Sequence, residues 1–254
     1  MAEMQKAQFD YKDHLQLDTI LNAQIPLSTH PEEYLFIIIH QIYELWFKTL
    51  LLDLERVVVH LEDDELPQAI WLLRRAGRIM EVADKQLDVL TMLTPGDFQE
   101  FRSDLKDASG LQSRQFRKVE VLGGLCETAG EDYAKRVEAQ WPGLRAEVET
   151  TLHQALMAAL DRHGIGLLEI YRQHWRHFDL FSLCEACLEF DAKVTTWRQN
   201  HVKMVERMIG TRAKGTGGTY GTRYLTATTV YRFFPELWEV RNELTKDAGG
   251  YVYK

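Results

Sequence analysis

His40 is a histidine set in an apolar segment. It lies in YLFIIIHQIYELWFK, residues 34–48, where most of the surrounding side chains are bulky and hydrophobic. In a helix this histidine shares a face with three aromatic rings, those of Phe36, Tyr43 and Phe47. A buried imidazole costs free energy unless its ring nitrogens have partners. His40 is therefore either a core histidine bonded to a backbone carbonyl or a residue that contacts a ligand.

His201 also stands in an apolar setting, within WRQNHVKMVERMIG. Its helical face continues through Val205 and Met208, and a glycine-rich segment, residues 210–224, follows directly. A haem iron needs from a protein one histidine on an apolar wall, because the porphyrin already supplies four nitrogens. A core histidine gives the same pattern, so the residues alone leave both interpretations open. The glycine-rich segment is either a hinge or a cradle for a ligand.

Arg102 is the third side chain with chemical potential. It lies in FQEFRSDL, where helical spacing places it on one face with Phe98 and Leu105. An arginine with apolar neighbours either extends to solvent or holds a carboxylate with its two-pronged guanidinium group. The sequence alone does not distinguish these two roles.

Helices must position these residues, because hydrophobic periodicity of i, i+3, i+4 and i+7 runs through long stretches such as 32–62 and 66–93, and no Asn-Gly or Asp-Gly hairpin signal occurs. The predicted fold is all-α. Thr94 is the expected N-cap of a helix with Pro95 at its first position and Asp97 in its first turn. Further helices are predicted over about 143–163, 165–175, 178–209 and from 224 into the 240s.

The composition describes an ordinary globular chain. It has 254 residues, 45% of them hydrophobic, which is enough for one substantial core and a single domain over 1–254. A net charge of −8 without a basic block argues against a nucleic-acid partner. The N-terminus has no signal-peptide core, and no apolar run approaches the roughly 18 residues that a membrane span needs. We expect a cytoplasmic protein whose three cysteines are reduced thiols.

Five blocks occur in order along the chain: LQLDTILNAQIPLS, LFIIIHQIYELWFK, LTPGDFQEFRSDLKDASGLQSRQFRKVE, WRQNHVKMVERMIG and GTGGTYGTRYL. Together they resemble the tryptophan 2,3-dioxygenase family, haem enzymes that open the pyrrole ring of L-tryptophan to N-formylkynurenine. The resemblance covers about residues 15–225 and is weakest between 125 and 190. It implies an all-helical homotetramer with a haem pocket between helices, haem b as cofactor, O2 as co-substrate, and L-tryptophan or a close analogue as substrate.

The resemblance also implies roles at the cofactor. His201 would be the axial ligand of the haem iron, and His40 the catalytic distal histidine that hydrogen-bonds the indole N–H. Ser109 and Gly217 would contact the cofactor, Ser109 near the haem edge and the polar end of the substrate.

At the substrate, the resemblance assigns Arg102 to the carboxylate and Thr216 to the ammonium group. In the family an N-terminal segment of a neighbouring subunit completes the pocket, which would bring residues 1–30, and Tyr11 in particular, into the site of another chain. The residues expected around the indole ring are Phe36, Phe98 and Leu105, with Tyr43 beside them.

Two positions and one insertion depart from the family pattern. His14 stands where a second N-terminal tyrosine is usual, Leu111 replaces a phenylalanine, and one extra residue separates His201 from Thr216. These departures motivate an alternative, a monooxygenase of the same superfamily that gives a 2-oxindole or hydroxylated product from a substituted tryptophan. A third possibility is a non-catalytic helical binding module, which holds if His201 is only a core residue.

Overall fold

The computed structural model describes residues 10–106, 110–212 and 222–249, and every regular element within them is helical, as predicted. The α-helices are α1 (Tyr11–His14), α2 (Leu17–Leu21), α3 (Glu32–Glu62), α4 (Leu66–Leu90), α5 (Pro95–Arg102), α6 (Arg114–Gly123), α7 (Leu125–Thr128), α8 (Glu131–Gln140), α9 (Leu152–His163), α10 (Leu167–Arg172), α11 (Phe178–Ile209), α12 (Thr222–Thr228) and α13 (Pro235–Asp247). Two short 3₁₀ turns, η1 (Gly110–Gln112) and η2 (Arg145–Glu147), complete the set.

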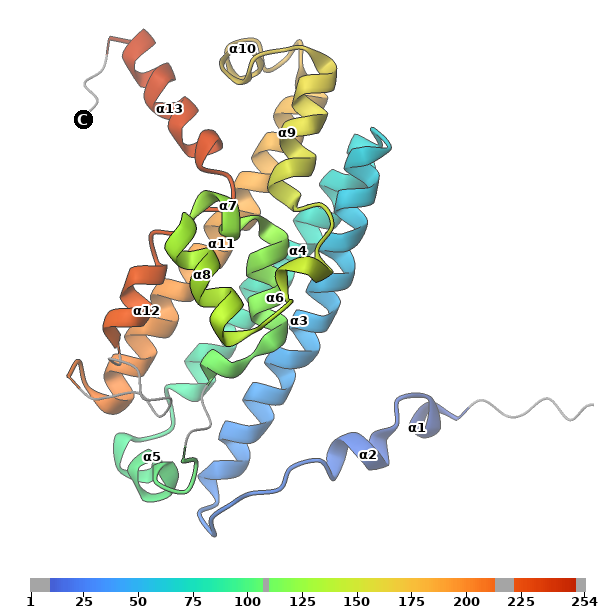
Figure 1. Ribbon diagram of the computed structural model, residues 1–254. Helices are drawn as coiled ribbons and strands as arrows, with labels where there is room; N and C mark the ends of the chain where they lie inside the picture. The colour runs from blue at the N-terminus through green and yellow to red at the C-terminus, as the bar shows by residue number, and fades with distance from the viewer. Residues whose placement is uncertain (1–9, 107–109, 213–221, 250–254) are drawn as a thin grey trace, which may run out of the picture.

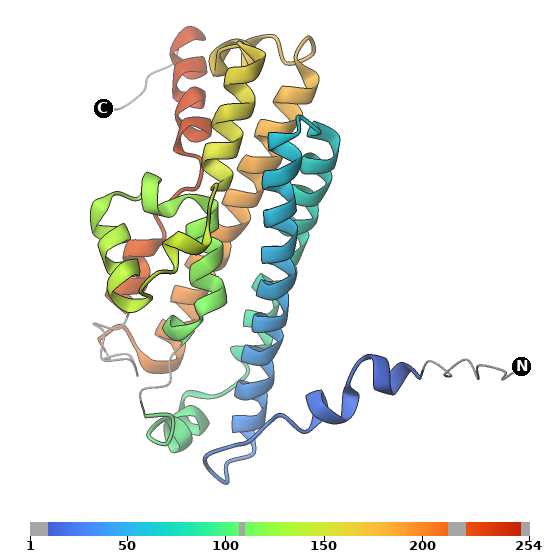
Figure 2. The same ribbon diagram turned by 45° about the vertical axis from the view of Figure 1, so that its right-hand side comes forward.

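Three long helices, α3, α4 and α11, form the body of the molecule and lie side by side in Figures 1 and 2. Their contact faces bury large apolar side chains completely, among them Leu54 on α3, Met80 on α4 and Phe190 on α11. Burying a Leu, Met or Phe side chain stabilises a fold by roughly 1.5–3 kcal/mol relative to leaving it exposed. The apolar periodicity of the sequence is therefore the source of this three-helix core, against which α6 and α9 also pack.

One described helix, α3, is long and apolar enough to cross a membrane by length and composition, so the expectation that no segment approaches this length was wrong. In this structure it packs against α4, α6 and α9 as a helix of the bundle.

The start of α5 is the one predicted from the sequence. The backbone N–H of Asp97 donates to the Thr94 hydroxyl at 3.1 Å, and the hydroxyl in turn donates to the Asp97 carboxylate at 2.6 Å. Pro95 occupies the first turn, where its missing N–H costs nothing. This cap sets where α5 begins, and so fixes the positions of Phe98 and Arg102 on it.

The helix predicted over 143–163 begins later, at Leu152, so that boundary was wrong. Thr151 and Gln154 form a capping box, in which the Gln154 N–H donates to the Thr151 hydroxyl and the Thr151 N–H to the Gln154 side chain. Such reciprocal bonds satisfy two N–H groups that a helix start leaves unpaired. The local hydrogen bonds, rather than the apolar period, decide where α9 begins.

A continuous helix from 224 into the 240s was also wrong, because the chain forms α12 and then α13. Pro235 opens α13, and the residue before a proline is disfavoured in helical conformation. The connection contains Phe233 and Phe234, both fully buried. The ring of Phe233 lies so close to Gly123 at the end of α6 that a Cβ there would approach it to 2.3 Å. The break thus anchors the C-terminal region to α6.

The N-terminal helices α1 and α2 extend away from the bundle (Figures 1 and 2). Several large apolar side chains of this segment are solvent-exposed in the single chain, including Leu21 at 69% and Ile25 at 78%. An exposed apolar segment of this kind is typical of a surface that another chain covers. The predicted homotetramer and the contact of residues 1–30 with a neighbouring subunit remain predictions.

Candidate active site

A cavity opens between α3, α4, α5, α6, α11 and α12, and most of the side chains around it are apolar. Six residues singled out in the sequence lie on its walls: Phe36, His40, Tyr43, Phe98, Arg102 and His201. They come from three separate helices, α3, α5 and α11. The fold therefore gathers into one space residues that are up to 165 positions apart in the chain.

His40 lies on α3 with its Nδ1 2.7 Å from the backbone carbonyl oxygen of Phe36. A carbonyl oxygen only accepts, so Nδ1 carries the hydrogen and donates it, which leaves Nε2 with a lone pair. The Phe36 ring packs beside the imidazole at a centroid distance of 4.2 Å. Burial lowers the pKa of His40, against the opposing effects of the Phe36 carbonyl and of Glu44. The neutral ring is therefore a hydrogen-bond acceptor on the cavity wall.

Glu44 lies one helical turn after His40 and also lines the cavity. Its position is fixed by Gln115 on α6, whose side-chain amide donates at 2.8 Å both to the Glu44 carboxylate and to its backbone carbonyl. This carboxylate raises the pKa of His40 because its negative charge favours the protonated ring. Glu44 was not among the predicted site residues, although its i+4 spacing from His40 is visible in the sequence.

His201 lies on α11, where its ring stacks on that of Trp197 at 5.3 Å and an interplanar angle of 14°. Burial, together with a smaller effect of the nearby His40, lowers the pKa of His201 to about 4. The imidazole is thus neutral at physiological pH. Neither of its ring nitrogens has a hydrogen-bonding partner among the described residues. His201 therefore presents an unused nitrogen lone pair to an apolar cavity whose wall continues through Met204, Val205 and Met208.

The protein ligands for a metal cage are missing from the described part of the chain, which contains no group of three or more His, Cys, Asp or Glu side chains that could hold an ion. A metal bound at His201 must therefore bring other ligands with it. A porphyrin does so, because its four nitrogens leave the protein to supply an axial ligand and an apolar slot. The donor set around His201 fits haem.

The short helix α5 supplies Phe98 and Arg102 to the cavity. Phe98 is buried, and its ring lies 5.8 Å from that of Phe36 on α3. Arg102 is the last residue of α5 and is half-buried. An aromatic wall next to a guanidinium group suits a ligand with a flat apolar part and an anionic end.

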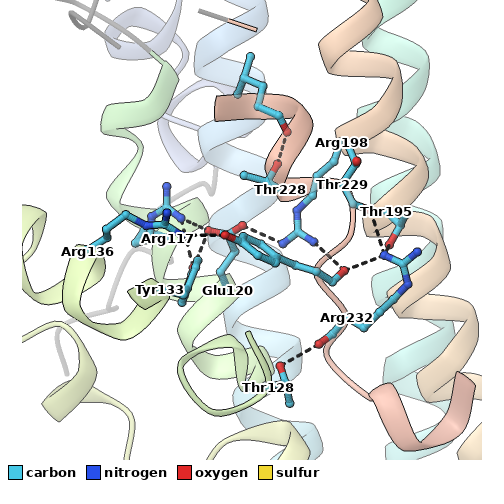
Figure 3. Close-up of polar contacts among 12 residues, drawn as sticks. Arg117, Glu120, Thr128, Tyr133, Arg136, Thr195, Arg198, Thr228, Thr229 and Arg232 are labelled. Atoms are coloured by element: carbon cyan, nitrogen blue, oxygen red, sulfur yellow. Dashed lines mark hydrogen bonds and ion pairs between the residues drawn. The ribbon is translucent and has the colours of Figure 1, made fainter. Parts of the chain in front are cut away.

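A buried charged cluster forms the α6 and α11 side of the cavity, and Figure 3 shows its side chains pointing toward one another. Arg117 and Arg198 both bind the Glu120 carboxylate, Arg198 at 2.7 Å, and the Tyr133 hydroxyl donates to the same carboxylate at 2.9 Å. All four residues are buried, Arg198 with 3% exposure. Two guanidinium groups share one carboxylate, and the buried Nε of Arg198 has no partner in the described structure. This wall therefore places two guanidinium groups beside the cavity, where they suit an anionic group, although Asp191 lies near Arg198 and offsets part of their charge.

The other predicted site residues lie elsewhere. Leu105 is buried in the core near α5 but does not line the cavity in the single chain. Tyr11 is 72% exposed on α1, away from the bundle (Figure 1). Ser109, Thr216 and Gly217 lie outside the described residues. The roles of all five stay predictions.

Comparison of the sequence with known proteins identifies the family. A family model described as Tryptophan 2,3-dioxygenase matches residues 1–162 and 127–244. A tryptophan 2,3-dioxygenase of Caulobacter vibrioides is 36% identical over 258 residues, which cover 92% of this chain and 98% of the relative. Those of Bacillus thuringiensis and a Bradyrhizobium species are each 34% identical over 267 residues, 94% of both chains. The chain belongs to the tryptophan 2,3-dioxygenase family.

Membership in the tryptophan 2,3-dioxygenase family confirms the resemblance seen in the five sequence blocks and the all-α fold class. It also makes the chain an enzyme, an oxidoreductase, rather than a binding module. The match runs through residues 125–190 as well, where the sequence blocks were weakest.

Proposed function

We propose that this enzyme is a haem-dependent dioxygenase that inserts both atoms of O2 across the indole C2–C3 bond of L-tryptophan and yields N-formylkynurenine. The observation that carries the proposal is the presence of two neutral imidazoles, from α3 and α11, on one apolar cavity with a guanidinium group at α5. The relatives named above, which match nearly the whole chain, support the same reaction.

In this proposal His201 would hold the iron of haem b, and Met204 and Val205 would form part of the apolar slot. The carboxylate groups of haem require cationic partners when they are buried, and the wall with Arg117 and Arg198 offers positive charge for them. When bound, the haem iron would supply the binding and activation of O2 that no amino-acid side chain provides. The predicted contacts of Ser109 and Gly217 belong to the same group.

His40 orients the substrate. Because its Nδ1 donates to the Phe36 carbonyl, its Nε2 is the atom that accepts the indole N–H. Phe36 and Phe98 pack against the flat ring, and Tyr43 lies beside them. Fixing one ring atom by a hydrogen bond and the flat ring by apolar contacts limits the orientations of the indole and excludes water.

Arg102 binds the carboxylate of the amino-acid end, and Thr216 with a haem carboxylate would hold the ammonium group. A zwitterion enters an apolar cavity at acceptable cost only when both of its charges are paired. Leu105, and Tyr11 from a neighbouring chain of a homotetramer, would close the pocket. Cytoplasmic localisation fits this metabolic role.

The deciding experiment is the mass of the product formed from L-tryptophan by the reduced holoenzyme under ¹⁸O2. Retention of two labelled atoms with an intact amino-acid end supports the dioxygenase. One retained atom in a 2-oxindole or hydroxylated product overturns it in favour of the monooxygenase, the alternative motivated by His14, Leu111 and the lengthened loop. A panel of ring-substituted tryptophans in the same assay identifies the preferred substrate.

Arg102→Ala should raise KM for L-tryptophan strongly. Removing one partner of a buried hydrogen-bonded charge pair costs on the order of 2–5 kcal/mol, because the other charge is left unpaired. Steady-state kinetics on the haem-loaded variant measures the change. Arg114→Ala, which removes an exposed arginine paired with Glu147, is the control and should leave KM unaltered. If Arg102→Ala also leaves KM unaltered, Arg102 does not bind the substrate.

Glu44→Gln should move the acidic limb of the kcat/KM profile to lower pH. His40 accepts a hydrogen bond only when neutral, so activity is lost as pH falls through its pKa, which burial already places below the ordinary value. The Glu44 carboxylate raises that pKa, and its neutralisation lowers it further. A shift of the limb toward higher pH would contradict the assignment of His40.

A further inference from the structure

We infer that His30 is a positioning residue for substrate binding: it ties the segment before α3 to α5 and thereby sets the position of Arg102. The inference deepens the proposed function and rests on Arg102 binding the substrate carboxylate. His30 does not line the cavity. His30 instead acts on α5, the helix that carries the Arg102 guanidinium group.

The helix α5 needs outside support. It has eight residues, and isolated helices shorter than about 12–15 residues are marginal in water. Its apolar face is held against α3 by aromatic contacts, since the Phe36 ring lies 5.8 Å from that of Phe98 and 5.9 Å from that of Phe101. These contacts attach one face of α5 to one partner ring. A polar contact from another segment adds a second point of attachment, which limits rotation of the helix about that face.

His30 supplies this contact. Its Nε2 lies 3.4 Å from a carboxylate oxygen of Glu100 and 3.7 Å from one of Asp97, both on α5. Its ring also packs beside that of Phe101, with a centroid distance of 5.8 Å. The other carboxylate oxygen of Asp97 accepts a hydrogen bond from the Thr94 hydroxyl, which holds the Asp97 carboxylate in place beside His30.

The orientation of the His30 ring is set locally. Its Nδ1 accepts from the backbone N–H of Glu32 at 3.3 Å, so the ring hydrogen is on Nε2, facing the two carboxylates of α5. Its own backbone N–H donates to the Ser28 hydroxyl at 3.1 Å. That hydroxyl donates to the buried Glu33 carboxylate, which also accepts the N–H groups of Leu27 and Ser28 at 2.8 Å. These hydrogen bonds in the turn before α3 hold the His30 ring in one orientation.

Loss of this contact should affect substrate binding rather than chemistry. Arg102 is four residues beyond Phe98, at the end of α5, so a small rotation of the helix displaces its guanidinium group. The fork geometry of arginine and carboxylate is sensitive to such displacement. His40 and His201 lie on α3 and α11 and are not moved by it.

The test compares holoenzyme variants by the Kd for L-tryptophan, measured by titration calorimetry, and by kcat. His30→Phe keeps a ring against Phe101 but removes the N–H. We expect Kd to rise about two- to fivefold, because the carboxylates are partly exposed, while kcat stays within about twofold. His30→Gln, whose amide N–H reaches the same side, should restore most of the affinity. Glu100→Gln, on the exposed α5 side, should weaken binding in the same direction.

His163→Phe is the matched control. His163 is the last residue of α9, and its Nε2 lies 3.0 Å from the Asp64 carboxylate, so the substitution also removes a contact between a histidine and a carboxylate. It should leave Kd unchanged. In an Arg102→Ala background, His30→Phe should add no further loss, because the two residues act in series. Additive losses, an unchanged Kd in His30→Phe, or no rescue by His30→Gln would overturn the inference. If instead Arg102→Ala itself leaves Kd unchanged, the proposed carboxylate site fails, which is a different result.

Discussion

His201→Ala is expected to purify without haem. The imidazole is the only histidine of α11 on the cavity wall, and the described residues offer no cluster that could hold iron without it. Alanine removes the donor atom and keeps the helix, because alanine has the best helix propensity. The Soret absorbance relative to protein should fall to background, and turnover of L-tryptophan should fall with it.

His40→Ala is the matched control for this prediction, since it removes the other neutral imidazole of the same cavity. That variant should retain haem and lose activity, because it lacks the acceptor for the indole N–H. Loss of haem in His40→Ala with retention in His201→Ala would mean that the two histidines have the opposite roles.

Glu120→Gln is expected to lower the free energy of unfolding by about 3–5 kcal/mol, the usual cost of removing one partner of a buried ion pair. The substitution keeps the shape of the side chain but leaves Arg117 and Arg198 buried without their shared carboxylate. Asp191, which also lies near Arg198, offsets part of the excess charge. Urea denaturation monitored by circular dichroism measures the change.

Glu147→Gln provides the comparison, because Glu147 pairs with Arg114 at the surface with both side chains close to half exposed. Exposed pairs contribute at most about 1 kcal/mol. Equal losses in the two variants would show that the cluster around Glu120 contributes no more than a surface pair.

Much of the fold was predictable because its signals are local. The apolar period of α3 and α11 runs for more than thirty residues in each, and the bounds predicted for α11 agree with the structure. Thr94 and Pro95 start α5 through contacts within one turn. The prediction failed at residues 143–163 and after 224. In the first case the Thr151 capping box overrides the apolar pattern, and in the second the buried Phe233 and Phe234 and the following Pro235 interrupt it.

The candidate site was predictable only in part. Pattern reasoning identified His40, Arg102 and His201 one at a time, and the family blocks related them, but only the fold shows that they share a cavity. The cluster around Glu120 was missed for a physical reason. Arg117 and Glu120 at i, i+3 look like an exposed helical pair, whereas the deciding partner, Arg198, is 78 positions away. No local spacing encodes such a contact.

The cavity walls belong to the same helices that form the core of the bundle. A group bound between α3, α6 and α11 therefore fills the interior of the protein as well as serving the reaction. Any ligand that binds only the folded chain stabilises it by RT ln(1 + [L]/Kd). If haem and tryptophan bind as proposed, the melting temperature and the resistance to proteolysis should increase with the supply of both. The cellular abundance of the enzyme would then rise and fall with the availability of these two ligands.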